Sequence, residues 1–321
     1  MKILVTGGAG FIGSHLCDRL LAEGHSVVCA DDLSLGRKAN IARNLGNPRF
    51  VFAQADVSSR RGYEGLFKGR RFDCVFHLAA NSDIQAGGEC PEIDLRRTFM
   101  TTFVTLELMR QYGVKRLVFA STSAIYGESD KPLNEDTGPF RPVSLYGAAK
   151  LSAESWISAF SENFGIRSWI LRFPNVIGPR ATHGVIFDFI GKLRANPRRL
   201  LILGNGKQCK PYLHVSDLVD AMVFVWKKAQ GRVSWHNIAG SGATTVDEIA
   251  RLTVAAMGLK KVKFAYTGSD RGWKGDVPRF SYDLRKIKKL GWKATMASTA
   301  AVARAAREIA GEARKPYGEM P

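Results

Sequence analysis

The chain has 321 residues, of which 45% are hydrophobic, enough to bury the core of one large domain or of two closely packed domains. No stretch approaches the roughly 18 uninterrupted apolar residues of a membrane-spanning helix, and the amino terminus leads directly into a glycine turn that leaves no room for a signal peptide. The five cysteines are scattered and odd in number, and none forms a Cys-x-x-Cys pair, which argues against a disulfide framework or a zinc site. We therefore expect a soluble, cytoplasmic protein with no metal site.

The formal net charge of +18 is compatible with a nucleic-acid or membrane surface, or with an anionic substrate. Lys and Arg residues are spread along the chain, with clusters at 194–199 and 285–293. The residues at 285–290 have the pattern of a solvated helix with an apolar seam. Because no array of aromatic residues for base stacking interleaves with these basic runs, we predict no nucleic-acid partner and no membrane partner.

Short apolar strands alternate with helical segments in the first half of the sequence. The predicted strands lie at 3–5, 27–30, 50–53, 74–78, 116–120 and 168–172. The predicted helices lie at 10–22, 61–68, 93–112 and 145–164. This alternation predicts an α/β fold of the Rossmann type, a doubly wound parallel sheet with helices on both faces. In such a sheet, ligands bind outside the carboxyl ends of the strands.

The alternation becomes irregular after about residue 175, where several prolines interrupt it. Beyond this point we predict a short strand at 200–203 and helices at 215–228, 245–257 and 298–313, the first of which returns toward the sheet. The predicted division is a Rossmann domain at 1–175, with a returning segment at about 213–240, and a smaller, interleaved domain at 176–321. A cleft is expected between the two domains.

A glycine-rich turn directly follows the first predicted strand, where Gly7, Gly10 and Gly13 have the spacing Gly-x-x-Gly-x-x-Gly. Gly7 permits the sharp turn, Gly10 lets the backbone approach a pyrophosphate, and Gly13 lets the next helix lie close to the strand. The helix amino terminus then offers free N–H groups and the positive end of its dipole. With a strand before it and a helix after it, this turn predicts dinucleotide binding.

The second predicted strand ends in Asp31 and Asp32. A carboxylate at this place can accept hydrogen bonds from the adenosine ribose hydroxyls and would repel a 2′-phosphate. Arg37 and Lys38, which follow closely, are the features that would favour NADP instead. We predict NAD as the cofactor.

Tyr146 and Lys150 are four residues apart, which places them on one face of the helix predicted at 145–164. A phenol with its ordinary pKa of about 10 is a poor base at neutral pH. A neighbouring ammonium, together with a positively charged nicotinamide ring, would lower this pKa toward the working range. Tyr-x-x-x-Lys is common by chance in a Lys-rich chain, so its weight comes from its combination with the glycine turn and with Ser121 and Thr122 at the end of another strand.

Six motifs together resemble the extended short-chain dehydrogenases/reductases, and specifically the NAD-dependent epimerase/dehydratase family. The motifs are TGGAGFIG at 6–13, HLAA at 77–80, STSAIYG at 121–127, YGAAK at 146–150, RFPNVIGP at 172–179 and YLHV at 212–215. They extend over nearly the whole chain. Within the family, the chain most resembles the UDP-glucose 4-epimerase branch.

The resemblance implies catalytic and cofactor-binding roles for residues of these motifs. Tyr146 would be the acid/base at the sugar 4-hydroxyl, Lys150 would hold the nicotinamide ribose, and Thr122 would hydrogen-bond the same sugar hydroxyl. Besides the three glycines, Asp31, Tyr146 and Lys150, the implied cofactor-binding residues are Phe11, Ile12, Asp32, Asp56, Val57, Leu78, Ala79, Ala80, Ser121 and Phe173.

The resemblance also implies that the domain at 176–321 binds a nucleotide sugar. Lys210 stands where the family usually has Arg, and Trp273 stands at the position of a phosphate-binding Arg, for which Arg271 or else Lys274 would substitute. Residues 185–187 and 201–203 would flank the uracil. The other implied substrate-binding residues are Asn81, Ser82, Thr122, Ser123, Ala124, Asn175, Val185, Ile186, Leu201, Leu203, Tyr212, Asp276 and Phe280.

The residues after Thr122 distinguish between the reactions of the family. Members that dehydrate or decarboxylate their substrate generally have an acidic residue one or two places further on, but Ser123 and Ala124 stand there in this chain. The resemblance therefore favours 4-epimerisation, which interconverts UDP-glucose and UDP-galactose through a 4-keto intermediate and transient hydride transfer to tightly bound NAD. Phe280 would crowd a 2-acetamido group and so disfavour UDP-N-acetylglucosamine.

Other functions remain open at this point. Arg96, Arg180 and His183 could bind a C6 carboxylate, which would make the protein a UDP-glucuronate 4-epimerase. A nucleotide-sugar dehydratase or decarboxylase is a further alternative. A non-catalytic, NAD-sensing relative is the last alternative, and the retained Tyr146 and Lys150 argue against it.

The segments at 98–112 and 151–164 are apolar, with large side chains such as Phe103 and Trp156. In the family that the chain resembles, helices of the first domain often form a dimeric four-helix bundle. We therefore expect a homodimer, although the same side chains could equally face the sheet.

Overall fold

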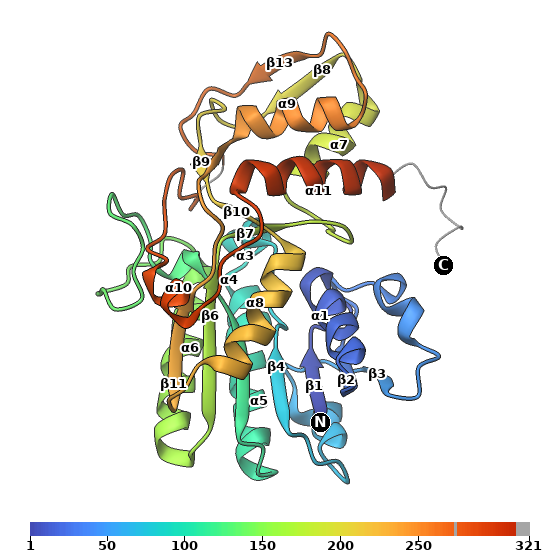
Figure 1. Cartoon of the computed structure of the whole chain (residues 1–321), viewed down its shortest axis with the longest axis vertical. Coiled ribbons are helices and arrows are strands. Elements are labelled where there is room, and N and C mark those ends of the chain that lie inside the picture. Colours follow the sequence, from blue (N-terminus) through green and yellow to red (C-terminus); the bar gives the residue numbers. More distant parts are fainter. Residues whose placement is uncertain (273–274, 313–321) are drawn as a thin grey trace.

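The computed structural model describes residues 1–272 and 275–312. A large α/β unit is built on a seven-stranded sheet, and a smaller unit of helices and short strands is stacked beyond the carboxyl ends of those strands (Figure 1). Within the described residues, no helix is both long enough and apolar enough to cross a membrane.

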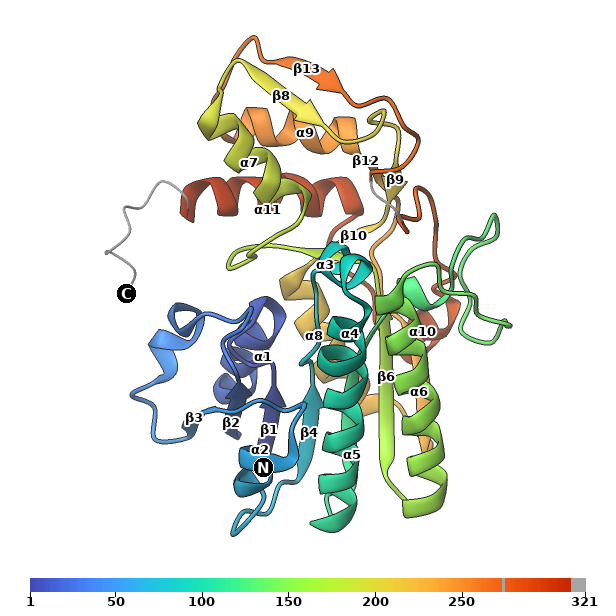
Figure 2. The same cartoon turned by 180° about the vertical axis from the view of Figure 1, so that it is seen from behind.

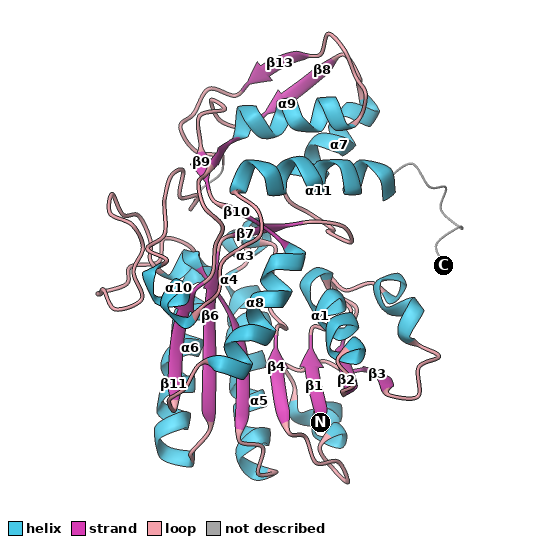
Figure 3. Cartoon of the chain, in the orientation of Figure 1, coloured by secondary structure: helices cyan, strands magenta, loops and turns pink. Residues whose placement is uncertain are grey.

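The large sheet is parallel throughout, with the strand order β11-β6-β5-β4-β1-β2-β3 (Figure 3). Its strands are β1 (Lys2–Thr6), β2 (Ser26–Asp31), β3 (Phe50–Gln54), β4 (Cys74–His77), β5 (Arg116–Thr122), β6 (Arg167–Phe173) and β11 (Val233–Asn237). The chain moves outward from β1 to β3 and then returns to the other side of β1 with β4. The strand order therefore reverses between β1 and β4, the place where doubly wound sheets bind their ligands.

Alternate residues of each strand face opposite layers of helices. Ile3 and Val5 of β1 lie in the core under α1 (Phe11–Ala22) and α8 (Val215–Lys228), whereas Leu4 lies in the core under α5 (Thr101–Gln111) and α6 (Leu145–Phe164). Figures 1 and 2 show these two helix layers on opposite faces of the sheet. The predicted doubly wound fold is confirmed.

Several predicted elements have different bounds or a different form. The helix predicted at 61–68 consists of two short turns, α2 (Arg60–Tyr63) and η2 (Glu64–Leu66), because Gly62 inside it has a φ of +87° that breaks the helix. The helix predicted at 93–112 is divided into α4 (Pro91–Asp94), the π-helical segment η3 (Leu95–Met100) and α5. The helix at 215–228 does return to the sheet, but the strand that follows it, β11 at the outer edge, is not among the predicted strands.

The remaining elements connect or build the smaller unit. They are η1 (Lys38–Asn44), α3 (Ile84–Glu89), η4 (Ser123–Ile125), β7 (Asn175–Ile177), α7 (Val185–Ala195), β8 (Arg199–Ile202), β9 (Cys209–Lys210), β10 (Tyr212–His214), β12 (Thr244–Thr245), α9 (Val246–Ala256), β13 (Lys263–Tyr266), α10 (Arg285–Leu290) and α11 (Ser298–Glu312). Short strand pairs β7–β10, β9–β12 and β8–β13 join segments far apart in the sequence. The core of the smaller unit lies between α7, α9 and α11.

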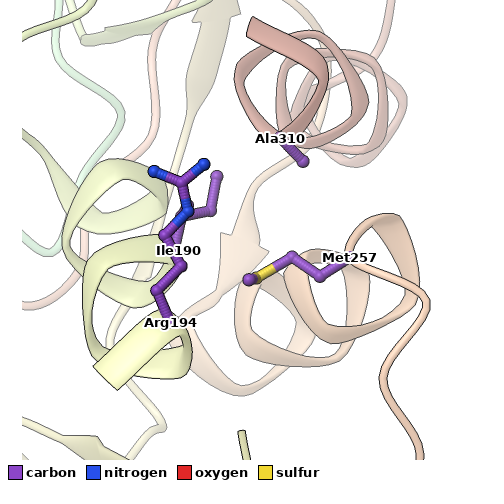
Figure 4. A pocket seen from close by; sticks show the side chains of 4 residues that line it. All are labelled: Ile190, Arg194, Met257 and Ala310. Carbon is purple, nitrogen blue, oxygen red and sulfur yellow. The ribbon is translucent and has the colours of Figure 1, made fainter. Parts of the chain in front are cut away.

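A small cavity lies where α7, α9 and α11 meet. It has a volume of about 50 Å³, and its wall is formed by Ile190, Arg194, Met257 and Ala310 (Figure 4). Sites for small-molecule ligands usually have volumes of about 300–1,000 Å³. This cavity is therefore a packing gap in the smaller unit and is too small to hold a nucleotide sugar.

Candidate active site

The glycine turn between β1 and α1 lies at the strand-order reversal. Gly7 has a φ of +68°, and a Cβ on it would lie 2.8 Å from the backbone nitrogen of Ala79 at the end of β4. A Cβ on Gly13 would overlap the carbonyl oxygen of Gly7. Gly10 is the N-cap of α1, followed by the half-buried Phe11 and Ile12. This close approach of backbone to backbone leaves the amino end of α1 accessible to a pyrophosphate, so the turn fits NAD.

The Asp31 carboxylate lies buried at the carboxyl end of β2, beside the glycine turn. It accepts hydrogen bonds from the backbone N–H groups of Ala9, at 2.9 Å, and Leu33, at 2.8 Å. Burial raises the pKa of Asp31, and these hydrogen bonds oppose the rise. Asp32 is exposed, and its carboxylate accepts hydrogen bonds from the backbone and hydroxyl of Ser34. Asp31 is thus the better placed of the two for the adenosine ribose.

Thr6 ties the carboxyl ends of β1 and β4 together. Its hydroxyl accepts hydrogen bonds from the N–H groups of Leu78, at 3.2 Å, and Ala79, at 3.3 Å, and lies 2.7 Å from Nδ1 of His77. Burial lowers the pKa of His77 to about 3, so this ring is neutral. The half-buried segment 78–80 is thereby fixed against the glycine turn, where the sequence predicts a cofactor contact.

Three further cofactor-binding predictions fall at other strand ends. Asp56 is exposed, and its carboxylate accepts hydrogen bonds from the backbone and hydroxyl of Ser58. Val57 is buried in the core beneath α5 and α6. Phe173 is buried at the end of β6. Of the three, Asp56 has a side chain open to the surface.

Tyr146, Thr122 and Lys150 come together at the carboxyl end of β5. Tyr146 lies in the first turn of α6, is half-buried, and is hydrogen-bonded to the side chain of Thr122, the last residue of β5. Lys150 follows one turn later with 1% of its surface exposed. Its Nζ donates a hydrogen bond of 2.7 Å to the Ala120 carbonyl and lies 5.9 Å from the centre of the Tyr146 ring. The predicted trio is therefore one local cluster.

The pKa values in this cluster differ from the sequence-based expectation. Burial lowers the pKa of Lys150 to about 7, although the charges of Glu154 and Asp94 raise it. Burial also raises the pKa of Tyr146, the Asp94 charge raises it further, and the hydrogen bond with Thr122 lowers it. The protein's own side chains thus favour a protonated phenol. Lys150 does not lower the pKa of Tyr146 as expected, since the buried Lys150 ammonium donates its hydrogen bond to the Ala120 carbonyl.

A buried ion pair beneath this cluster was missed by the sequence analysis. Glu154 of α6 accepts from Arg172 of β6, with 2.6 Å between Oε2 and Nη2, and their side chains are only 4% and 3% exposed. Glu154 also accepts a hydrogen bond from the Ser121 hydroxyl, so this predicted cofactor residue is turned toward α6. The repeat of Tyr146, Lys150 and Glu154 at four-residue intervals was the signal that could have shown their common helix face.

Four of the residues predicted to face the sugar follow the carboxyl ends of β4 and β5. Ser123 and Ala124 form the half-buried turn η4 directly after β5. Asn81 is buried, and its Nδ2 donates to Oδ1 of Asp94 at 3.0 Å, while Ser82 is exposed. The Asn81 side chain is therefore held by the protein and has limited capacity for a ligand.

On the proposed diphosphate side, the structure pairs several predicted residues with one another. The Asn175 side chain is hydrogen-bonded to the buried phenol of Tyr212, whose pKa is raised by burial. Lys210 forms a buried ion pair with Asp276. Arg271 forms a half-exposed ion pair of 2.9 Å with Glu128. Trp273 and Lys274 lie outside the described residues.

The apolar residues predicted to flank the uracil differ in exposure. Leu201 and Leu203 are exposed, as is Phe187, and Val185 is half-buried. Ile186 instead faces the core of the smaller unit with 2% of its surface exposed, so Phe187 is the side chain of its segment that reaches the surface.

Phe280 and the candidate carboxylate ligands are also placed by the structure. Phe280 is half-buried and packs on Ile125 and its neighbours, close to the η4 turn. Arg180 forms an ion pair of 2.8 Å with Asp18 of α1. Arg96 forms an exposed ion pair with Glu92, and His183 is bonded to the backbone of Ser82. Arg96 and Arg180, the two arginines predicted to bind a C6 carboxylate, therefore each form an ion pair with a carboxylate of the protein itself.

Residues 3–239 match the model of the NAD dependent epimerase/dehydratase family. The chain belongs to this family. It is 31% identical to the UDP-glucose 4-epimerase of Mycolicibacterium smegmatis, over 95% of this chain and 97% of that protein. It is 35% identical to UDP-arabinose 4-epimerase 1 of Arabidopsis thaliana, over 91% of this chain and 75% of that protein. The crystal structure of UDP-glucose 4-epimerase with UDP-glucose from Thermotoga maritima is similar with a TM-score of 0.86 and 32% identity, over 96% of this chain and 98% of that one.

These matches confirm the family, the fold class and NAD as the cofactor of the family. They also agree with the predicted enzyme class, an isomerase of the UDP-sugar 4-epimerase type. The roles of individual side chains, the domain boundary near residue 175 and the homodimer stay predictions.

Proposed function

We propose that this protein is an NAD-dependent UDP-sugar 4-epimerase that interconverts UDP-glucose and UDP-galactose. The observation that carries the proposal is the hydrogen bond between Tyr146 and Thr122 beside the buried Lys150, at the sheet edge that also holds the glycine turn. A phenol, a hydroxyl and an ammonium at this place can together accept the proton of a sugar hydroxyl and donate it back, next to the cofactor.

The glycine turn and Asp31 would hold NAD, which would supply a reversible hydride acceptor for C4 of the sugar. To accept the 4-hydroxyl proton, Tyr146 would have to be ionised, which the positive nicotinamide ring would favour against the effect of burial. It would later donate the proton back, and Thr122 would orient the same hydroxyl. Ser123 and Ala124 have no acid or base for elimination, so the residues present suit an overall reaction without loss of water. The protein's part is to position the sugar, to set the proton affinity of Tyr146 and to exclude water.

The ion pairs of the arginines favour a neutral sugar over a uronic acid. Arg180 and Arg96 are paired with Asp18 and Glu92, so a C6 carboxylate would have to compete with these acids. The similarity to a plant UDP-arabinose 4-epimerase makes a pentose the second candidate. The panel of substrates in the experiment below therefore includes the UDP-hexoses and UDP-arabinose.

Incubation of the purified protein with UDP-, dTDP- and GDP-sugars should convert UDP-glucose and UDP-galactose into each other. We expect kcat/KM for UDP-N-acetylglucosamine to be lower by about 10- to 200-fold, because Phe280 would crowd the 2-acetamido group and a small difference of substrate size in an apolar pocket is worth about 1–3 kcal/mol. Chromatographic separation of the products measures both rates. Phe280→Ser should reduce the difference between the two rates, and Leu45→Ser, at an exposed apolar residue that follows η1, should leave it unchanged. Equal turnover of the acetamido sugar would contradict this role of Phe280, and conversion of no nucleotide sugar would contradict the proposed function.

We also propose that two copies associate through the outer faces of α5 and α6. Trp156 and Phe164 are 42% and 39% exposed, and Trp156 makes edge-to-face contacts with Phe99 and Phe103 across the two helices. Large exposed apolar patches of this kind mark interfaces. The patch is continuous along α6, where Ser155, Trp156, Ala159, Phe160, Asn163 and Phe164 line a surface groove.

Trp156→Glu should therefore convert the protein from a dimer to a monomer at micromolar concentration, because a buried, unpaired carboxylate is strongly disfavoured in an interface. Sedimentation equilibrium measures the mass of the particle in solution. Leu45→Glu is the matched control, since Leu45 is an equally exposed apolar residue far from this patch, at 47% exposure. A wild-type monomer, or a Trp156→Glu dimer, would disprove this interface.

A cytoplasmic location is also proposed for this protein. All five cysteines are free, and Cys17, Cys29 and Cys74 are buried as thiols. Unpaired thiols are typical of proteins that fold in a reducing compartment.

A further inference from the structure

The segment that packs against the amino-terminal half of α6 contains a buried carboxylate for which the proposed mechanism has no role. Asp94 is the last residue of α4, and the π-helical segment η3 follows it directly. Asp94 is 1% exposed, whereas Glu92, Arg96 and Arg97 of the same segment are exposed. The π-helix is rare and is frequently found at functional sites.

The two Asp94 carboxylate oxygens differ in their hydrogen bonds to the residues that the structure describes. Oδ1 accepts from Nδ2 of Asn81 at 3.0 Å and from the hydroxyl of Thr98 at 3.2 Å. The Thr98 hydroxyl in turn accepts from the backbone N–H of Asn81 at 3.1 Å. Oδ2 is buried with no hydrogen-bond partner in the described part of the chain, and a Cβ on Gly87 would overlap it. Because an unpaired, buried carboxylate oxygen is costly, packing alone does not explain an acid at this position.

The charge of Asp94 acts on the two central groups of the active site. It raises the pKa of Lys150 and the pKa of Tyr146. The charge of Lys150 in turn lowers the pKa of Asp94, which burial raises. The other carboxylate that acts on Lys150 is Glu154, and this one is neutralised by Arg172.

Asp94 is surrounded by titratable groups of α3, α6 and β4. On the α3 side, Asp83 at the helix N-cap raises the pKa of Asp94, and Glu89 is exposed. On α6, the groups are Tyr146, Lys150 and Glu154. Beneath Lys150, the buried His77 is neutral because its pKa is lowered to about 3. Asp94 therefore acts on both Tyr146 and Lys150, and no arginine among residues 1–272 and 275–312 forms an ion pair with it as Arg172 does with Glu154.

We propose that Asp94 is a positioning residue for the reaction: its buried carboxylate, held by Asn81 and Thr98 in the segment that packs against α6, balances the Lys150 ammonium and thereby assists proton transfer at Tyr146. This inference rests on the proposed epimerase function. The same hydrogen bonds also fix Asn81, which begins the loop predicted to face the sugar. One carboxylate thus connects the sugar-facing loop to the proton-transfer pair.

Asp94→Asn tests the charge while keeping the shape and the acceptor oxygen for Asn81 and Thr98. Loss of one negative charge lowers the pKa of both neighbours, so both limbs of the pH profile of kcat should move to lower pH by about one unit. Glu92→Gln removes a charge two residues away on the exposed face of the same segment and should leave the profile in place. Asp94→Ser removes the charge with a smaller side chain, and its profile should move in the same direction.

A second measurement separates this inference from the proposed function. Ultraviolet difference titration of the protein against its Tyr146→Phe variant reports the ionisation of Tyr146 without any sugar turnover. Asp94→Asn should move this titration to lower pH by about one unit. Unmoved titration and unmoved limbs in variants with normal thermal unfolding would overturn the inference and reduce Asp94 to a packing role. A moved titration in a protein that converts no UDP-sugar would instead overturn the proposed function.

Discussion

Tyr146→Phe should lower kcat for UDP-galactose by about 10³-fold, within the 10²- to 10⁴-fold range of general acid–base catalysis. The substitution keeps the ring and removes the hydroxyl that is bonded to Thr122, so the sugar 4-hydroxyl loses its proton acceptor. NAD binding should be nearly unchanged, because the glycine turn and Asp31 lie on other strands of the sheet. Steady-state rates measure the first effect, and the NAD content of the purified protein measures the second.

Tyr112→Phe is the matched control for this experiment. Tyr112 also loses a hydrogen-bonded hydroxyl, which donates to Glu64 at 2.8 Å on the far end of α5. Its turnover should equal that of the unchanged protein. Retained activity in Tyr146→Phe would exclude the phenol as the acid/base, and loss of NAD from that variant would show that the Tyr146 hydroxyl also serves to hold the cofactor.

The parts of the site that could be predicted from sequence are set by local geometry. Gly7, Gly10 and Gly13 are placed by one strand–turn–helix unit, and Asp31 by the end of the next strand. Tyr146 and Lys150 share a helix face because their spacing equals about one helical turn. Thr122 meets Tyr146 because the carboxyl ends of parallel strands and the amino ends of the helices that follow them lie at the same edge of the sheet.

The parts that could not be predicted depend on contacts between distant segments or on irregular backbone. The spacing of apolar residues predicts a regular helix around Asp94, and it does not predict the π-helical turn that follows this residue. The pairing of Lys210 with Asp276 joins residues that are 66 positions apart in the sequence. The pKa of Tyr146 could not be predicted either, because desolvation and the Asp94 charge depend on packing that the Tyr-x-x-x-Lys spacing does not describe.

The ion pair of Glu154 and Arg172 likewise joins segments that the sequence pattern does not connect. Because the pair is buried, we expect its loss to have a large effect on stability. Glu154→Gln should lower the free energy of unfolding by about 3–5 kcal/mol, because it leaves the buried Arg172 guanidinium without its counter-charge. Ser121 loses its charged partner at the same time. Urea unfolding of the purified protein measures the change.

Glu162→Gln is the control on the same helix. Glu162 forms an ion pair with Arg232 with the same 2.6 Å separation, but the two side chains are 76% and 54% exposed, so its loss should cost only about 0–1 kcal/mol. A double variant, Glu154→Leu with Arg172→Met, should be less destabilised than the sum of its single variants, because it leaves no buried charge unpaired. If Glu154→Gln and Glu162→Gln lowered the free energy of unfolding equally, burial would add nothing to the strength of the Glu154–Arg172 pair. If the losses of the two single variants added up in the double variant, the two side chains would not act as a unit.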